Sequence, residues 1–549
     1  MPDPLISRTE SAYTYPLLIK NLLQFPIVNC PEQEIVYRDQ QRFSYKTLQE
    51  RICRLANALI DMGVKPGDTV AVMDWDSHRY LECFFAVPMI GAVLHTVNVK
   101  LSPEQILYTV DHAEDDVLLI HSDFIPIVEQ IKGRIATVRD YILLTDSDED
   151  FDSQIPFSTD YESCLAKASP LATFNDFDEN TRATTFYTTG TTGMPKGVYF
   201  SHRQLVLHTL GALAALGTPE TQGRMHQGDV YMPITPMFHV HAWGLPYVAT
   251  VLGVKQVYPG KYSPDVLLDL IAHEQVTFSH CVPTILHMLF KSPKIDQCDL
   301  SRWKVIIGGS ALSKVLCNEA LDRGIDIFTG YGMSETCPLL SLAHLDAEML
   351  KLDREEQIEY RCKTGRPMPL VDLRVVNEEV QDVDLGAQNS GEIVARAPWL
   401  TQGYLKDTKN SENLWRGGYL HTGDVAMRDA RGYVKITDRT KDVIKSGGEW
   451  ISSLELEDIF SHHSAIAEVA VIAQPDEKWG ERPLALVVLK DGLEDLPSKK
   501  DLLALLHEYT DTGVISKQVI LTRVKFVNAI DKTSVGKINK KCLREKYLS

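Results

Sequence analysis

The sequence is short of positive charge. It carries 74 acidic residues against 56 lysines and arginines, which gives a formal net charge of −18. Proteins that bind nucleic acid mass lysine and arginine on one face, so this deficit predicts that nucleic acid is not a partner. An anionic ligand would therefore have to be held by a local group of donors.

Paired cysteines and long apolar runs are also missing. The ten cysteines are scattered without a C-x-x-C pair, so neither a zinc site nor a disulfide framework is predicted. Charged residues interrupt the first 23 positions, where a signal peptide would need an apolar stretch. No run approaches the ~20 apolar residues of a membrane span. These features predict a cytoplasmic protein with reduced thiols and no transmembrane segment.

The composition is that of a folded globular protein. With 549 residues, 44% apolar and 24% charged, the chain is too long for one ordinary domain. Short β-rich apolar runs end in glycine or proline and are followed by helical patterns. They lie at 69–73, 184–187, 277–282, 305–307 and 325–328. This alternation predicts an α/β fold with largely parallel sheets.

The pattern changes twice toward the C-terminus. After Gly365, strand-like segments at 373–376, 391–395 and 433–437 predict a small β-rich subdomain. A last unit follows, with strands at 468–473 and 484–489 and a helix at 500–509. We therefore predict a large N-terminal domain at 1–440 with its β-rich subdomain at 364–440, a hinge at 438–442, and a small α+β C-terminal domain at 441–549.

A loop rich in glycine and threonine follows the strand-like run at 183–186. Its sequence is Tyr187-Thr-Thr-Gly-Thr-Thr-Gly-Met-Pro-Lys-Gly197. Glycines let backbone N–H groups turn toward an anion, threonine hydroxyls add neutral donors, and Lys196 adds a positive charge. The spacing is not that of a Walker P-loop. The loop is thus a candidate polyphosphate site of another type, and the alternative is a surface linker rich in turn formers.

This loop resembles the phosphate loop of the adenylate-forming superfamily of acyl-CoA synthetases, adenylation domains and luciferases. Four more segments are similar to motifs of that superfamily. In order, they are the adenine and magnesium motif Tyr331-Gly-Met-Ser-Glu-Thr336, the ribose motif Thr422-Gly-Asp424, the hinge Asp438-Arg-Thr-Lys-Asp442 and the lysine motif Val535-Gly-Lys537. Five motifs in register across nearly the whole chain have little chance of arising together. The chain is identified as a member of the superfamily.

The resemblance implies a two-step ligase reaction. ATP and a carboxylic acid would give an acyl-adenylate and pyrophosphate, and coenzyme A would then take the acyl group. ATP, Mg²⁺ and coenzyme A are the expected cofactors or co-substrates. Because the two steps need different surroundings, a mobile C-terminal domain is expected. The resemblance also implies a homodimer. Peripheral membrane contact would suit a lipid substrate, although no basic amphipathic helix supports it.

The resemblance also assigns roles to individual residues. Lys537, Glu335 and His239 are the candidate catalytic residues, and Thr188 and Glu335 would share the magnesium ion, a hard cation that prefers oxygen ligands. Asp424 would accept the ribose hydroxyls. Ser334 replaces the commoner threonine but keeps a hydroxyl. The candidate ATP and AMP contacts are Thr188, Thr189, Gly190, Thr191, Thr192, Gly193, Lys196, Val240, Gly309, Thr329, Gly330, Tyr331, Ser334, Asp424, Arg439, Lys445 and Trp450.

Several of these residues have simpler interpretations. Lys537 lies among other lysines and could belong to a solvated basic tail, while Thr422-Gly-Asp424 alone would be an ordinary turn. Trp450 could equally be a packing aromatic at a domain interface. The two histidines of His239-Val-His241 invite a metal site, but a packed or hydrogen-bonded histidine is favoured because no further ligand cluster is evident.

The remaining assignments concern coenzyme A and the acid. Lys441 matches the hinge residue, and Gly447 and Gly448 would line the coenzyme A passage. Pro236-Met-Phe-His-Val-His-Ala-Trp-Gly244 is similar to the segment that carries a gate tryptophan, here Trp243, in the medium- and long-chain fatty acyl-CoA synthetases. No basic residue at 243–251 could pair a second carboxylate, which favours an apolar acyl tail.

A fatty acid is therefore the favoured substrate, but its length cannot be read from the sequence. A short-chain or aryl acid remains an alternative within the superfamily. A peptide-synthetase module and a luciferase-type oxygenase are less favoured. From a different class, a catalytically silent nucleotide- or acyl-binding relative is the other alternative, although the joint presence of Lys537, Glu335 and Asp424 argues against it.

Overall fold

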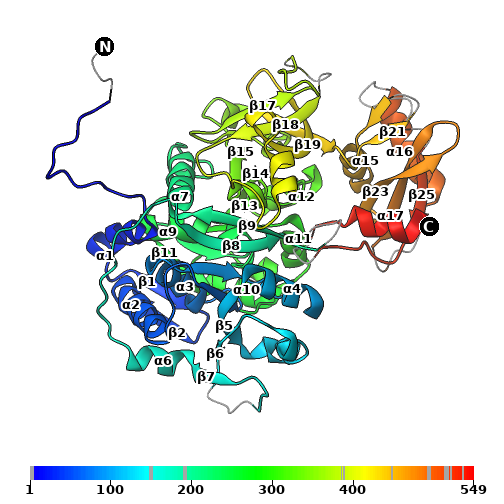
Figure 1. Cartoon of the computed structure of the whole chain (residues 1–549). Coiled ribbons are helices and arrows are strands. Elements are labelled where there is room, and N and C mark those ends of the chain that lie inside the picture. The colour runs from blue at the N-terminus through cyan, green and yellow to red at the C-terminus, as the bar shows by residue number, and fades with distance from the viewer. Residues whose placement is uncertain are drawn as a thin grey trace.

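The computed structural model describes residues 5–147, 152–188, 194–384, 386, 390–446, 449–490, 492, 496–511, 519, 522–533 and 537–548. Figure 1 shows a large N-terminal part with a smaller C-terminal part attached at one side, and an extended N-terminal segment that leaves the body of the molecule. This is the predicted α/β architecture of a large domain followed by a small one. No helix within the described ranges is long and apolar enough to cross a membrane.

Two mixed sheets form the centre of the large part. One has nine strands in the order β16-β15-β14-β13-β12-β10-β11-β1-β2, and the other has seven in the order β7-β6-β5-β3-β4-β8-β9. The strands of the first sheet are β1 (Glu34–Tyr37), β2 (Gln41–Ser44), β10 (Val230–Pro233), β11 (Lys255–Tyr258), β12 (Phe278–Cys281), β13 (Lys304–Ile307), β14 (Asp326–Gly332), β15 (Leu339–Leu342) and β16 (Arg366–Pro367). Those of the second are β3 (Thr69–Met73), β4 (Val93–Thr96), β5 (Asp115–His121), β6 (Asp140–Leu144), β7 (Phe157–Asp160), β8 (Arg182–Thr188) and β9 (Lys196–Ser201).

Strands of the nine-stranded sheet are buried on both faces. Ile306 and Phe328 belong to the core shared with the seven-stranded sheet, whereas Val305, Ile307 and Ile327 belong to a second core under α10, α11 and α12. Continuous apolar runs are the pattern of such doubly covered strands, which explains why the sequence revealed them. The helices of the large part are α1 (Gln24–Asn29), α2 (Tyr45–Asp61), α3 (His78–Met89), α4 (Pro103–Ala113), α5 (Ile125–Glu129), α6 (Tyr161–Lys167), α7 (His202–Gly217), α8 (Val240–Trp243), α9 (Leu245–Leu252), α10 (Pro264–Glu274), α11 (Pro283–Phe290), α12 (Lys314–Asp322), α13 (Arg354–Arg361) and α14 (Thr408–Leu414).

Short 3₁₀ turns complete the large part. They are η1 (Ile19–Leu23), η2 (Ser122–Phe124), η3 (Lys132–Arg134), η4 (Pro293–Gln297), η5 (Ser334–Thr336), η6 (Met349–Lys351) and η7 (Arg416–Gly418). Of these, η5 positions a candidate site residue, because Glu335 is its central residue.

One predicted local pattern is wrong. The run at 184–187 lies in β8 and was expected to lead into a helix, but the antiparallel strand β9 follows it, with Thr188 opposite Lys196. Val198 and Phe200 are buried in the core while Tyr199 between them is only half-buried, which is strand alternation. Helix α7 begins only after β9, where Ser201 and Gln204 form a capping box.

The β-rich segments predicted after Gly365 are present. Strands β17 (Asp372–Val376), β18 (Gly391–Arg396), β19 (Leu420–Arg428) and β20 (Val434–Arg439) form an antiparallel sheet in that order. The C-terminal part has its own five-stranded sheet and two apolar cores of its own. Its elements are β21 (Ile444–Ser446), β22 (Glu449–Ile451), α15 (Ser453–Ser461), β23 (Ile466–Asp476), β24 (Gly480–Leu489), α16 (Lys499–Asp511), β25 (Arg523–Phe526) and α17 (Lys540–Leu548).

Candidate functional site

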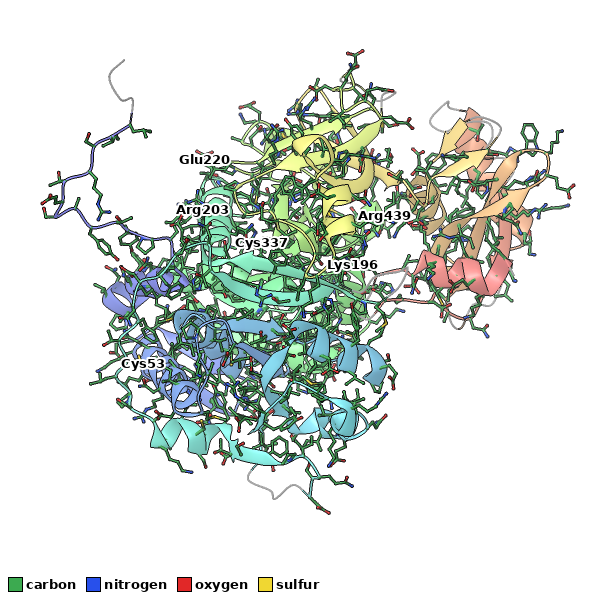
Figure 2. The ribbon with its side chains drawn as sticks, in the orientation of Figure 1. Cys53, Lys196, Arg203, Glu220, Cys337 and Arg439 are labelled. Carbon is green, nitrogen blue, oxygen red and sulfur yellow. The ribbon has the colours of Figure 1, made fainter. Side chains whose placement is uncertain are left out.

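The ends of the β8–β9 hairpin define one edge of the site. Thr188 and Lys196 are paired across the two strands. The loop between them holds the predicted contacts Thr189, Gly190, Thr191, Thr192 and Gly193, which lie outside the described residues. The Lys196 ammonium lies 4.6 Å from the centroid of the Tyr404 ring, a cation–π contact. Figure 2 shows Lys196 and Arg439 on the side of the large part that faces the C-terminal part.

Glu335 stands next to this edge. Its carboxylate accepts a 2.7 Å hydrogen bond from the Tyr404 hydroxyl, so one tyrosine connects Lys196 to Glu335. Burial raises the pKa of the Glu335 carboxyl, and the Tyr404 hydrogen bond and the positive charges of Lys196 and Lys537 oppose that rise. Glu335 is therefore a buried carboxylate whose negative charge is partly offset by two nearby lysines.

A second carboxylate is held by the β19–β20 hairpin. Asp424 and Arg439 are directly opposite one another in the register, and the Arg439 Nε lies 3.3 Å from the Asp424 Oδ1. The other oxygen, Oδ2, accepts a 2.8 Å hydrogen bond from the hydroxyl of Tyr331 at the end of β14. Burial and the charge of Asp424 keep the pKa of Tyr331 well above its ordinary value, so this hydroxyl stays a donor.

The predicted contacts on β14 and in the turn after β13 differ in the partners and the space around them. The Thr329 hydroxyl donates to the carbonyl of Arg361 at 2.8 Å, so this hydroxyl already has an internal partner. Gly330 has no room for a side chain, because a Cβ there would lie 2.8 Å from Ile306. Gly309 adopts a φ of +79°, and a Cβ there would lie 3.2 Å from the Lys537 Cε.

Lys537 reaches this place from the C-terminal part. Figure 1 shows that the described residues between β25 and α17, at 527–533 and 537–539, extend from that part toward the large one. The side chain is half-buried beside Gly309 and lies within electrostatic reach of Arg439, Asp424 and Glu335. Burial and the charge of Arg439 lower the pKa of the Lys537 ammonium to about 8, although the two carboxylates oppose the change. A basic tail in solvent, the plainer interpretation of the sequence, would not have this environment.

A buried polar network joins the two parts near residue 440. The Asp438 Oδ2 accepts hydrogen bonds from the backbone N–H and the hydroxyl of Ser453, at 2.6 and 2.7 Å. Lys540 donates to the same hydroxyl at 2.6 Å and pairs with Glu457 at 2.7 Å. Burial raises the pKa of Asp438, and Lys540 and Ser453 oppose that rise. Because Asp438 is in β20 while Ser453 and Lys540 are in the C-terminal part, the network fixes how the two parts dock.

The predicted hinge residue lies just after this network. Burial and the neighbouring Arg439 charge lower the pKa of Lys441. The next residue, Asp442, pairs with Arg544 of α17 at 2.7 Å. Lys445 lies in β21 opposite Trp450 in β22, whereas Gly447 and Gly448 between these strands lie outside the described residues.

The segment at 236–244 forms a strained turn. Val240, His241, Ala242 and Trp243 all have positive φ values between 47° and 59°, and Gly244 continues the left-handed run. Left-handed conformation costs about 1–2 kcal/mol for each residue with a side chain. Val240 and Trp243 are buried at this turn, so the surrounding packing over-determines it. Strain of this kind is concentrated at functional sites.

His239 lies just before the left-handed residues, and Trp243 is one of them. The Trp243 ring packs over Gly308, where an added Cβ would lie 2.9 Å from the ring, and its centroid lies 5.0 Å from that of His280. Burial and the Lys537 charge lower the pKa of His239 to about 3, so its imidazole is neutral. His241 packs instead among aromatic rings, with Phe186 at 5.3 Å and Phe84 at 5.7 Å between centroids.

Some residues of the site carry no signal in the sequence. Tyr404 joins Lys196 to Glu335, but nothing in Thr401-Gln-Gly-Tyr404 distinguishes it from other tyrosines that follow a glycine. Asp76 accepts a 2.6 Å hydrogen bond from the Met237 N–H and so holds the start of the turn that carries His239. Asp438 was noted only as part of the hinge motif.

The site can hold a polyanion together with a hard cation. Three cationic side chains and two carboxylates converge on the seam between the two parts: Lys196, Arg439, Lys537, Glu335 and Asp424. Within the described part of the chain, no three acidic, histidine or cysteine side chains gather to bind a metal by themselves. A cation beside Glu335 would therefore take most of its ligands from water or phosphate, which is how Mg²⁺ is usually bound.

Known proteins resemble this chain over most of its length. The family described as AMP-binding enzyme matches residues 27–405, and the AMP-binding enzyme C-terminal domain matches residues 455–537. The chain is 39% identical to a long-chain-fatty-acid–CoA ligase of Thermus thermophilus over 94% of this chain and 93% of that protein. It is 37% identical to a 3-methylmercaptopropionyl-CoA ligase of Ruegeria lacuscaerulensis over 97% and 98%.

A solved structure shares the fold. An anthranilate CoA ligase in complex with anthranoyl-AMP superposes with a TM-score of 0.83 at 22% identity, covering 97% of both chains. At that level of identity the likeness concerns the fold alone.

Proposed function

Because the chain belongs to the AMP-binding enzyme family and is an AMP-forming acyl-CoA ligase, we propose that its substrate is a fatty acid. The acid and ATP would give acyl-adenylate and pyrophosphate, and coenzyme A would displace AMP to give the fatty acyl-CoA. The approach of Lys537 to the Glu335–Asp424–Arg439 group carries the catalytic part of this proposal. A silent binding protein would not need a lysine from another domain at that position.

Adenylation brings two anions together, since a carboxylate attacks the α-phosphate of ATP. In this proposal Lys537 neutralises the charge that develops between them, because an ammonium about 4 Å away contributes about 4 kcal/mol at a surface-like dielectric. The neutral imidazole of His239 is within reach of the same charge and adds a hydrogen bond without a second cation. Lys196 and the loop at 189–193 would hold the outer phosphates.

The nucleoside would lie along β14 and the β19–β20 hairpin. Asp424 would accept the ribose hydroxyls, with Tyr331 and Arg439 fixing its orientation. Gly309, Thr329, Gly330 and Ser334 would line the adenine face, and Val240 would contact it from the turn. Lys445 and Trp450 are the further nucleotide contacts that we propose.

Glu335 and Thr188 are the residues that we propose would hold Mg²⁺. When bound, it supplies the positive charge that screens the phosphates and helps pyrophosphate leave. Glu335 offers one carboxylate for the ion, and Tyr404 orients that carboxylate through its hydrogen bond. Because phosphate and water would have to supply the remaining ligands, the metal would bind together with ATP.

The thioester step would use a second domain arrangement. We propose a domain boundary near residue 440, rotation of 441–549 about Lys441, and a coenzyme A passage lined by Gly447 and Gly448. The separate sheet and cores of the C-terminal part support movement as one body. Rotation about Lys441 would withdraw Lys537 from the site.

The acyl tail would enter past Trp243. This buried aromatic ring packs over Gly308 and offers the tail an apolar surface. A second candidate is a short functionalised acid, of the kind named for the Ruegeria relative. The buried His280 favours it, because its Nδ1 has no hydrogen-bond partner while its Nε2 pairs with the Tyr231 hydroxyl at 2.8 Å.

Pyrophosphate release tests the proposal. The purified protein would be given MgATP and saturated acids of increasing length, 3-methylmercaptopropionate, benzoate and acetate, with and without coenzyme A. We expect release that depends on a fatty acid, with AMP and acyl-CoA formed in equal amounts. Faster release with 3-methylmercaptopropionate than with any fatty acid would select the second candidate. No release with any acid would contradict both.

Adenylation should depend on the protonation of Lys537. Its amine, with a pKa of about 8, is charged below that pH and neutral above it. We therefore expect kcat/KM for ATP to fall as pH rises through about 8, because the cation is lost in that direction. The profile is measured by pyrophosphate release from pH 6 to 10. In Lys537→Arg the fall should disappear, since guanidinium stays charged. The same fall in Lys537→Arg would contradict the assignment.

Asp438→Asn should weaken the docking that delivers Lys537. Hydrogen bonds to a charged group contribute about 1.5–3 kcal/mol, so the docked population and the adenylation rate should fall about 10- to 100-fold. Thioester formation from supplied acyl-adenylate should not fall. Asp531→Asn is the matched control, since it removes a surface pair with Lys546 that contributes little. Equal loss in both half-reactions would show that Asp438 serves stability rather than docking.

Oligomeric state and location complete the proposal. We propose a homodimer in the cytoplasm, with any membrane contact peripheral. The extended N-terminal segment supports self-association, because Leu5, Ile6, Tyr13 and Tyr15 on it are exposed. All ten cysteines are free, as a reducing compartment requires. Sedimentation equilibrium at several concentrations would distinguish a dimer from a monomer.

A further inference from the structure

The C-terminal end of helix α4 lies between two segments of the candidate site. On one side, the Nδ1 of His112 is 2.8 Å from the hydroxyl oxygen of Tyr187, and the two groups share a hydrogen bond. Tyr187 directly precedes Thr188 at the end of β8. On the other side, the Lys406 ammonium donates to the carbonyl of His112 at 3.0 Å. His112 is therefore bonded to both segments.

The segment that ends at Lys406 also carries the residues that hold Glu335. The Tyr404 hydroxyl donates to the Glu335 carboxylate at 2.7 Å, and the N–H of Thr401 donates to the Glu335 carbonyl at 3.0 Å. Tyr404 also forms a β-bridge with Val198 of β9. Residues 401–406 therefore run from Glu335, past the β8–β9 hairpin, to the end of α4.

Lys406 meets two negative groups at the end of α4. Glu114 is the C-cap residue of the helix, with a φ of +59°, and its carboxylate lies 2.8 Å from the Lys406 ammonium. A carboxylate alone is unfavourable there, because the last carbonyls of a helix already carry partial negative charge. Lys406 offsets the carboxylate and binds one of these carbonyls, that of His112. At the other end of α4, Ser102 and Gln105 form a capping box, so the helix is capped at both ends.

The Tyr187 ring is buried among other rings, so its hydroxyl has a fixed direction. Its centroid lies 5.2 Å from that of His95 and 6.4 Å from that of Tyr108. Tyr108 stacks on His112 at 5.1 Å between centroids, and so contacts the same histidine through its ring, whereas Tyr187 contacts it through its hydroxyl. Replacing Tyr187 by phenylalanine would therefore remove the hydrogen bond and keep the ring packing.

We propose that the end of α4 positions Thr188 and Glu335 relative to one another for binding of a magnesium–nucleotide complex. This inference rests on the proposed function, in which these two residues hold the ion. Tyr187 fixes the first of them through its bond to α4, and Lys406 fixes the second through residues 401–406. Mg²⁺ demands near-ideal octahedral geometry, so a displacement of one protein ligand from the other weakens its binding. Tyr187 and Lys406 are thus positioning residues, and neither contacts the ion.

Magnesium-dependent binding of ATP tests the proposal without catalysis. The dissociation constant of ATP is measured by titration calorimetry on the full-length protein without acid, once with MgCl₂ and once with EDTA. In Tyr187→Phe and in Lys406→Met, we expect the gain in affinity that magnesium gives to fall about tenfold, while binding in EDTA is unchanged. The double variant should lose no more than the weaker-binding single variant, because either substitution alone breaks the connection through α4.

Matched variants control for the packing and for the lost charge. Tyr108→Phe removes a hydroxyl from the same group of rings, and Lys351→Met removes an exposed lysine that pairs with Glu348; both should bind as the wild type does. An unchanged magnesium gain in both single variants would overturn the proposal, as would losses that add in the double variant or that are equal in EDTA. So would a wild-type protein whose ATP affinity ignores magnesium. Failure of the proposed substrate would be seen separately, as wild-type binding of MgATP without pyrophosphate release for any acid.

Discussion

Lys537→Ala is expected to reduce the rate of acyl-adenylate formation by a factor on the order of 10²–10³ while leaving thioester formation from supplied acyl-adenylate nearly unchanged. Removal of one preorganised charge-stabilising donor typically costs about 2.7–4 kcal/mol of transition-state stabilisation. Lys537 contacts the Gly309 turn and lies within electrostatic reach of both carboxylates in this structure. The second half-reaction would take place after rotation, with this lysine withdrawn.

The two half-reactions can be measured apart. Pyrophosphate release from MgATP and acid reports the first, and acyl-CoA formed from synthetic acyl-adenylate and coenzyme A reports the second. Lys532→Ala is the matched control, because Lys532 lies in the same segment but pairs with Glu468 at the surface. It should retain near wild-type rates in both assays. Equal losses in both half-reactions of Lys537→Ala would show that the lysine supports the fold or binding, not adenylation.

Much of the fold could be predicted because strands that are buried on both faces appear in the sequence as continuous apolar runs. β3 coincides with the apolar run at 69–73, and β13 and β17 lie within one residue of the predicted runs. β9 was missed because it starts with a lysine and a glycine and shows its alternation only from Val198 onward. A hairpin and a strand–helix unit cannot be told apart when the turn between them is a long loop of small residues.

The site was predictable only to the extent that its residues fall in recognisable motifs. The motifs name Glu335 and Asp424, and also Tyr331 and Arg439 as nucleotide contacts, but they do not indicate which side chains pair with one another, and they do not name Tyr404. Tyr404 is 69 positions from Glu335, and Tyr331 is 93 positions from Asp424. Contacts between side chains so far apart depend on how sheets and hairpins pack, which local patterns do not encode. The depressed pKa of Lys537 has the same origin, because it arises where two separately folded parts meet.

Glu335→Gln is expected to lower the adenylation rate by a factor on the order of 10² at fixed magnesium and to raise the magnesium concentration required for half-maximal rate. The substitution keeps the size of the side chain and an oxygen that can accept the Tyr404 hydrogen bond, so the local geometry should persist. What is lost is the negative charge, and Mg²⁺ binds carboxylates in preference to neutral amides. The same change leaves the Lys196 and Lys537 charges without their carboxylate.

The magnesium dependence distinguishes this role from a structural one. Pyrophosphate release is measured over a wide range of MgCl₂ at constant ionic strength, because screening would otherwise change with the metal. Tyr404→Phe retains the carboxylate and should show a smaller loss, with partial recovery at high magnesium. Glu348→Gln, at an exposed pair with Lys351, should resemble the wild type. A loss in Glu335→Gln with an unchanged magnesium requirement would assign the carboxylate to balancing the two lysine charges, with the ion held by phosphate alone.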